Sequence, residues 1–179
     1  MRSVALLKEP PGRVRYLSDD EGTRLLEALR PDIRAVVITA LLTGMRRGEI
    51  LGLKKSAVDF SAQVFKLTET KTNKARYVPI HDSLVPILRQ AIDRSTSDHV
   101  FTNLVGKPLT HRVAAVFRRT VTKLGIRDLR FHDLRHDFAT KLRRNGMGLD
   151  LIATLLGHST LSMTQRYAHL GREDLRAAV

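Results

Sequence analysis

The spacing of the apolar residues changes twice along the chain, and this change most constrains the fold. From about Ser18 to Leu53 the apolar residues recur every three or four positions, which is typical of helices that bury one face. Between Val58 and Ile80 they alternate instead, which predicts three short strands in an antiparallel meander. The helical spacing then returns for the rest of the chain. The sequence therefore predicts an α+β fold, mostly α, with one small three-stranded antiparallel sheet.

Local signals predict where several helices begin and end. Ser18 and Glu21 have the spacing of a capping box, in which each side chain binds the backbone amide of the other residue. Gly44 and Gly157 each follow an apolar helical stretch and are expected to end it in the left-handed conformation. The last third is predicted to be helical throughout, with Tyr167 on the final helix or at its end.

The length of 179 residues suits one domain. Residues 1–15 contain Pro10, Pro11 and Gly12 and show no clear period, so we predict an arm or the remnant of a linker there. Residues 16–179 are predicted to form the domain.

The charge of the chain indicates a polyanionic partner. The formal net charge is +13, and the sequence pI is about 10.9. Between Lys107 and Arg144, eleven lysines and arginines face three aspartates, which leaves +8 of the +13 in that region. Such an excess favours nucleic acid over an anionic membrane surface, and over a basic surface that merely binds water.

Composition and motifs exclude several other classes of site. The chain has no cysteine, which rules out disulfides, thiolate metal sites and cysteine nucleophiles. It contains neither the HExxH pattern of zinc enzymes nor the GxxxxGK[ST] loop that binds ATP phosphates. The longest mainly apolar run, 35–42, is too short to span a bilayer. We expect no metal, no cofactor and no membrane partner, and a cytoplasmic protein.

One stretch, 132–170, combines histidines, an arginine and a late tyrosine within basic helices. These residue types suit phosphoryl transfer on DNA. An arginine fork grips two phosphate oxygens and stays charged, and a positioned phenol can attack phosphorus. Outside the stretch, Arg46 beside a helix start and Lys71 in a predicted turn are candidates for the same site. Glu49 is interpreted as a structural partner for a nearby arginine rather than as a catalytic carboxylate.

Five motifs give the chain a resemblance to a known family. They are TGMR at 43–46, K-x-N-K-x-R-x-V-P at 71–79, H-x-L-R-H-x-F-A-T at 132–140, L-G-H-S at 156–159, and a tyrosine nine residues after the histidine of the fourth motif. Together, in this order, they resemble the catalytic domain of the tyrosine recombinases, the phage integrase family. The resemblance extends from about Arg15 to Leu170 and implies the catalytic-core fold of that family.

The resemblance implies six catalytic residues. Tyr167 would be the nucleophile that forms a 3′-phosphotyrosine link, and Lys71 the general acid towards the leaving 5′ oxygen. His132 would assist proton transfer. The phosphate would be held by Arg46, Arg135 and His158. Lys74 is only three residues from Lys71, but the family pattern around this segment favours Lys71 as the acid.

The resemblance also implies duplex DNA as partner and a site-specific recombinase that integrates or excises a phage or another mobile element. Three alternatives stay open, namely DNA relaxation like that of type IB topoisomerases, a chromosome-dimer or inversion recombinase, and a DNA-binding module without catalysis. The resemblance also implies a nucleoid-associated protein encoded by a bacterium or phage. Family members usually carry an N-terminal core-binding domain, which is expected to be absent here, and self-association into a tetrameric synapse is expected of the full-length protein. Further basic residues are expected to contact DNA: Lys74, Arg76, Arg112, Arg118, Arg119 and Lys123.

Overall fold

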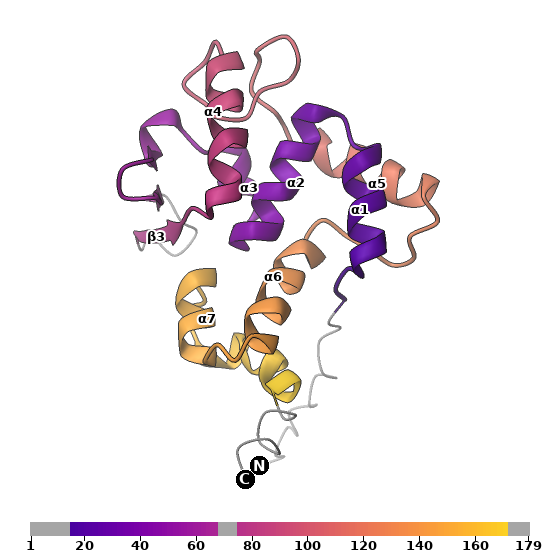
Figure 1. Cartoon of the computed structure of the whole chain (residues 1–179), viewed down its shortest axis with the longest axis vertical. Helices are drawn as coiled ribbons and strands as arrows, with labels where there is room; N and C mark the ends of the chain where they lie inside the picture. The colour runs from indigo at the N-terminus through magenta and orange to yellow at the C-terminus, as the bar shows by residue number, and fades with distance from the viewer. Residues whose placement is uncertain (1–14, 68–74, 172–179) are drawn as a thin grey trace, which may run out of the picture.

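Helix α2 (Pro31–Thr43) is the central element of the computed structural model, which describes residues 15–67 and 75–171. It packs against α1, α3, α4, α5 and α6 (Figure 1). Its sequence is apolar on all sides rather than along one stripe, as expected of a buried helix. Ile33, Val36 and Ala40 are at most 2% exposed. The other helices are arranged around this buried rod.

The remaining elements follow in chain order. The α-helices are α1 (Asp19–Ala28), α3 (Arg47–Leu51), α4 (Val85–Arg94), α5 (Arg112–Lys123), α6 (Asp133–Arg144) and α7 (Leu149–Leu156). Short 3₁₀ helices are η1 (Lys55–Ala57), η2 (Asp82–Leu84), η3 (Leu161–Met163) and η4 (Gln165–Gly171). The strands are β1 (Val58–Asp59), β2 (Val64–Leu67) and β3 (Arg76–Pro79).

The three strands form one antiparallel sheet in the order β1-β2-β3, as the alternating pattern predicted. Val58 pairs with Phe65, and Phe65 in turn pairs with Val78. Phe65 and Val78 face the core and are at most 1% exposed, whereas Tyr77 is 67% exposed. The predicted mostly α fold with a small sheet is thus confirmed. Residues 1–14, where an arm was predicted, lie outside the described residues, and that division of the chain stays a prediction.

The capping signals work as predicted at three helix ends. Ser18 and Glu21 form both hydrogen bonds of the capping box at the start of α1. Gly44 ends α2 with φ of 62°, and Gly157 ends α7 with φ of 65°. A side chain at Gly44 would also collide with Phe138 of α6, so this glycine permits α2 and α6 to approach closely.

The last third is less helical than predicted. After α7 the chain continues as the two short 3₁₀ helices η3 and η4 rather than as an α-helix, and Tyr167 lies on η4. The Tyr167 side chain is 1% exposed and packs in a small apolar cluster with Ala139, Ile152 and Leu156. Burial of the aromatic ring therefore holds this end of the domain against α6 and α7.

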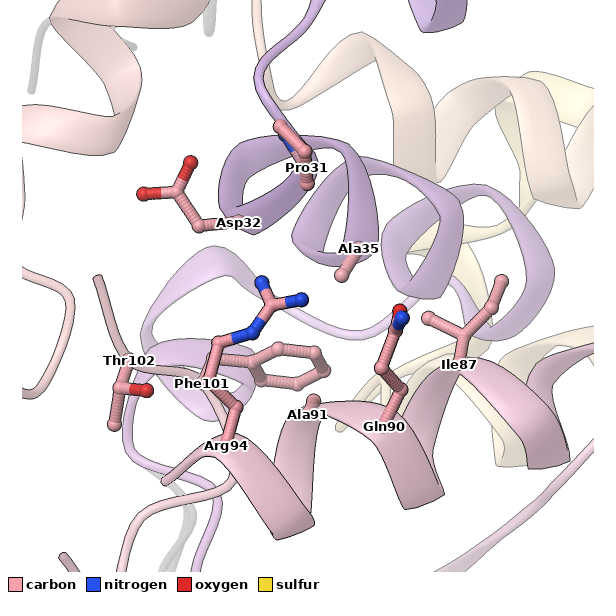
Figure 2. A pocket seen from close by; sticks show the side chains of 9 residues that line it. All are labelled: Pro31, Asp32, Ala35, Ile87, Gln90, Ala91, Arg94, Phe101 and Thr102. Carbon is pink, nitrogen blue, oxygen red and sulfur yellow. The ribbon is translucent and has the colours of Figure 1, made fainter. Parts of the chain in front are cut away.

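A gap between α2 and α4, shown in Figure 2, is lined by side chains of both helices and by Phe101 and Thr102. Its volume of about 20 Å³ is close to the space that one water molecule occupies. We therefore regard it as a packing gap. Within 15–67 and 75–171, no helix is long and apolar enough to cross a membrane.

Candidate active site

Residues from four separate segments converge on one pocket with a volume of about 90 Å³. This is well below the roughly 300 Å³ at which typical small-molecule sites begin, so the pocket suits a group as small as a phosphate. Most of its side chains are cations or hydrogen-bond donors. The lining residues are Arg46, His132, Arg135, His136, His158, Met163, Arg166 and Tyr167.

Arg135 is the most buried cation of the pocket, at 4% exposure. Its Nη1 donates to the carbonyl oxygen of Gly44 at 2.8 Å, and its Nη2 donates to that of Leu156 at 2.6 Å. These carbonyls lie at the C-terminal ends of α2 and α7, where helix dipoles place partial negative charge. Burial, and next the neighbouring Arg46, lowers the pKa of Arg135 to about 10, so the guanidinium stays charged at neutral pH. Its remaining N–H groups can serve a bound anion.

Arg46 stands just before α3 and is fixed by two partners. Its Nη1 donates to Glu49 Oε1 at 3.0 Å, and its Nη2 donates to the carbonyl oxygen of Gly157 at 3.1 Å. Arg76 donates two hydrogen bonds to the same carboxylate, from Nη1 to Oε1 at 2.8 Å and from Nη2 to Oε2 at 2.9 Å. Burial alone would raise the pKa of Glu49, but the hydrogen bonds and charges of Arg76 and Arg46 lower it overall. Glu49 is therefore the structural partner that the sequence indicated.

Three histidines line the pocket in different settings. His132 occupies the N-cap position of α6 and is exposed, while His136 lies one turn later and is 7% exposed. His158 Nδ1 lies 2.7 Å from the Thr164 hydroxyl. Burial, followed by nearby positive charge, lowers the pKa of both His136 and His158 to about 4. Both rings are therefore neutral at pH 7.

Tyr167 also lines this pocket, and its hydroxyl contacts a neighbouring histidine. The Oη atom lies 2.5 Å from His136 Nδ1, and the two ring centroids are 5.9 Å apart. Burial raises the pKa of Tyr167 to about 12, and the charges of Arg166 and Arg135 only partly oppose this effect. The phenol is therefore protonated in the free protein. To react as a nucleophile, it must pass its proton to a base.

A larger cavity of about 550 Å³ adjoins the pocket and shares His132 with it. Its floor is apolar and includes Phe117 and Phe131, whereas its rim carries Arg118 and Arg130. An apolar floor with a cationic rim suits a strand that has sugars and bases as well as phosphates. The pocket and the cavity together form a cationic surface beside the tyrosine.

A sequence model of the phage integrase family matches residues 15–173. The chain belongs to the phage integrase family. The match covers all of the described residues, including every residue that lines the small pocket.

Relatives within the phage integrase family include a tyrosine recombinase XerC from Staphylococcus epidermidis. It is 32% identical to this chain over 93% of the chain and 62% of its own length. The first curated relatives are matched over only 46% to 62% of their lengths. The chain thus spans about half to three fifths of these proteins.

Solved structures of the family share the fold. The catalytic domain of bacteriophage HP1 integrase is 29% identical, with a TM-score of 0.73, and the match covers 93% of this chain and 94% of that domain. The XerH recombinase bound to its palindromic difH substrate is 26% identical with a TM-score of 0.72, over 92% of this chain and 52% of XerH. The predicted catalytic-core fold of the tyrosine recombinases is therefore confirmed.

The structure brings together five of the six residues that the family resemblance implies as catalytic. These five line the small pocket: Arg46, His132, Arg135, His158 and Tyr167. Lys71 and Lys74 lie outside the described residues. Arg76 was expected to contact DNA. Its side chain is 10% exposed and forms an ion pair with Glu49. The other expected DNA contacts are exposed on α5: Arg112, Arg118, Arg119 and Lys123.

Three residues of the pocket had no role predicted from the sequence, namely His136, Met163 and Arg166. His136 follows His132 by four positions, so both rings lie on the same face of α6, with their centroids 5.0 Å apart. That spacing was the signal that could have identified it. For Arg166, next to Tyr167 on a 3₁₀ helix, the local sequence holds no comparable signal.

Acid should destabilise the folded chain as the pH falls from about 6.5 towards about 4. The pKa of His136 is 6.5 ordinarily and about 4 in the fold, so the unfolded chain binds this proton first as the pH falls. Stability should therefore decline between these two pH values, by up to about 3 kcal/mol for this residue. Urea unfolding at pH 7.5 and pH 4.5 would measure the decline. The His136→Asn variant should show a smaller decline, and an equal one would contradict the assignment.

Proposed function

We propose that the chain is the catalytic part of a site-specific DNA recombinase, which cleaves and rejoins DNA through a 3′-phosphotyrosine link to Tyr167. One observation carries this proposal. The Tyr167 hydroxyl, the Arg46 and Arg135 guanidinium groups and three imidazoles line a single phosphate-sized pocket. Membership of the phage integrase family supports the same chemistry.

In the proposed reaction, Arg46 and Arg135 bind the non-bridging oxygens of the scissile phosphate and neutralise the charge that grows on them. Tyr167 Oη attacks phosphorus, and the bond from phosphorus to the 5′ oxygen breaks. That oxygen takes a proton from Lys71. Rejoining runs the same steps in reverse, with a 5′ hydroxyl as the attacking group. The ester keeps the energy of the broken bond, so no ATP is needed.

The positive charge of the pocket comes from guanidinium groups. Their hydrogen-bond partners are neutral backbone carbonyls and a single carboxylate. Arg135 binds the carbonyls of Gly44 and Leu156, and Arg46 binds that of Gly157 together with Glu49. The cations are thus positioned while most of their charge remains available to a phosphate. We propose that the reaction uses these groups with no metal ion and no cofactor.

The proposed partner is duplex DNA. The net charge of +13, the four exposed basic residues of α5 and the arginine-rimmed cavity beside His132 all favour a polyanion that runs past the pocket. The related XerH was solved bound to a DNA substrate. For the complete recombinase we propose a tetrameric synapse, association with the nucleoid, and integration or excision of a phage or mobile element.

Covalent trapping tests this proposal. The protein is mixed in EDTA with nicked suicide duplexes carrying a presumed attachment site or a randomised pool, and adducts are separated on a denaturing gel. Trypsin should then release a nucleotide-bearing peptide that starts at Tyr167, because Arg166 precedes it. No adduct at DNA concentrations that saturate binding would contradict the proposal and favour a binding module. Relaxation of supercoiled plasmids of any sequence would favour the topoisomerase-like alternative.

A further inference from the structure

The hydrogen bond between His136 and Tyr167 has no place in the roles that the family resemblance implies. His136 Nδ1 and Tyr167 Oη are 2.5 Å apart, and both side chains are almost fully buried, at 7% and 1% exposure. The bond joins α6 to η4 at the atom that must react. A buried imidazole in direct contact with a nucleophilic hydroxyl is the arrangement in which a base activates a nucleophile.

We propose that His136 is the proton acceptor for Tyr167, so that the phenolic proton moves to His136 Nδ1 as Oη attacks the phosphate. This inference rests on the proposed recombinase function and deepens it. It makes His136 a catalytic residue, since the ring contacts the reacting oxygen. The resemblance implies that His132 assists proton transfer. If His136 accepts the proton of Tyr167, His132 acts instead on the phosphate or on the leaving group.

The positions of the two α6 histidines support this division of roles. His132 stands at the helix start, is exposed and also lines the large cavity. His136 lies one turn further along α6, is 7% exposed and contacts the Tyr167 hydroxyl. Among the described residues, Tyr167 Oη makes its side-chain hydrogen bond to His136 and none to His132. A candidate base must lie within about 3.2 Å of the atom whose proton it removes, and His136 Nδ1 meets this condition at 2.5 Å from Tyr167 Oη.

The proposed step balances. The O–H bond of Tyr167 breaks, the proton and a positive charge pass to His136, and a bond forms between Oη and phosphorus. The bond between phosphorus and the 5′ oxygen breaks, and this oxygen accepts a proton from Lys71, the acid of the proposed function. During rejoining, the deprotonated lysine takes the proton of the attacking 5′ hydroxyl, and the His136 imidazolium returns its proton to the departing phenolate.

The charges around His136 explain why the phenol is inert until DNA binds. With the pKa of Tyr167 near 12 and that of His136 near 4, the proton stays on oxygen in the free protein. A bound phosphate brings negative charge among the cations, which favours the imidazolium. Ionisation of the nucleophile is thereby coupled to the presence of its substrate. The titratable and charged groups that face His136 come from α6, from η4 and from the turn after α7: His132, Asp133, Arg135, Arg166, Tyr167 and His158.

The His136→Asn variant tests the proposal, because an asparagine oxygen can accept the phenol hydrogen bond without taking the proton. Single-turnover cleavage on a suicide duplex should slow by about 10²–10⁴-fold, the usual contribution of a general base, while DNA binding is retained. The acid limb of the pH–rate profile, which reports protonation of the base, should disappear. His136→Gln is the second variant, should the asparagine fail to fold by thermal melting.

A substrate with sulfur at the bridging 5′ position separates the base from the acid. A thiolate leaves without a proton, so this substrate should restore the rate of Lys71→Ala but not that of His136→Asn. A His136→Asn rate within tenfold of the unmodified protein, or its restoration by sulfur, would overturn the proposal. If the unmodified protein forms no adduct on either substrate, the proposed function itself fails, and this result is distinct from a defect confined to His136 variants.

Discussion

Replacing Tyr167 with phenylalanine should abolish covalent attachment to DNA and leave the affinity for DNA within about twofold. The change removes only the hydroxyl, which is the proposed attacking group, and no other group could form the phosphotyrosine bond. The ring itself remains packed against Ile152 and Leu156, so the fold of η4 should be retained. Suicide-duplex trapping measures the first effect, and a gel-shift titration at fixed salt measures the second.

The matched control is Tyr77→Phe, because Tyr77 lies 67% exposed on β3, away from the pocket lining. That variant should form adducts at the normal rate. Persistent adducts in Tyr167→Phe would refute the assignment of the nucleophile. The same variant leaves His136 without its buried partner, so we expect it to unfold with a free energy lower by about 1–3 kcal/mol.

The second large effect is expected from Arg135→Lys. A lysine keeps the charge but cannot hold the Gly44 and Leu156 carbonyls and a phosphate oxygen together, because it lacks the planar fork of N–H donors. Single-turnover cleavage should therefore fall by about 10³–10⁵-fold, which is the range for an arginine that stabilises phosphoryl transfer. Rapid-quench assays at saturating DNA would separate this loss from a change in binding.

Arg119→Lys provides the comparison, since Arg119 is exposed on α5 and lies outside the pocket lining. At saturating DNA its cleavage rate should stay within a few fold of that of the unmodified protein. A loss below tenfold in Arg135→Lys would argue against phosphate binding by Arg135. Thermal melting must accompany both assays, because unpaired carbonyls at the ends of α2 and α7 should also lower stability.

The elements that could be predicted from sequence are those set by local chemistry. The capping box at Ser18, the left-handed glycines at 44 and 157 and the alternation through β2 depend on neighbours within a few residues. Most of the pocket could also be predicted, but through the family motifs rather than through spacing alone. Resemblance to a family predicts which residues far apart in the sequence share a site. Local periodicity predicts only helices and strands.

What could not be predicted depends on contacts between distant segments. Arg76 was expected at the DNA, and its side chain is paired with Glu49 of α3, a contact that nothing near Arg76 in the sequence indicates. The bond between His136 and Tyr167 requires α6 and η4 to meet, and nothing near either residue indicates that they do. The 3₁₀ geometry of the last segment, where Tyr167 is buried against α6 and α7, likewise has no local signal in the sequence.

The wide separation of the site residues along the chain has a consequence during synthesis. The ribosome makes Arg46 first, then α6, and Tyr167 only near the end of the described sequence. Basic surfaces can thus emerge and fold while the attacking hydroxyl is still missing, because chains fold from the N-terminus as they are made. A nascent or prematurely terminated chain could therefore hold DNA without nicking it. In the proposed mechanism, strand cleavage therefore requires that synthesis has reached η4.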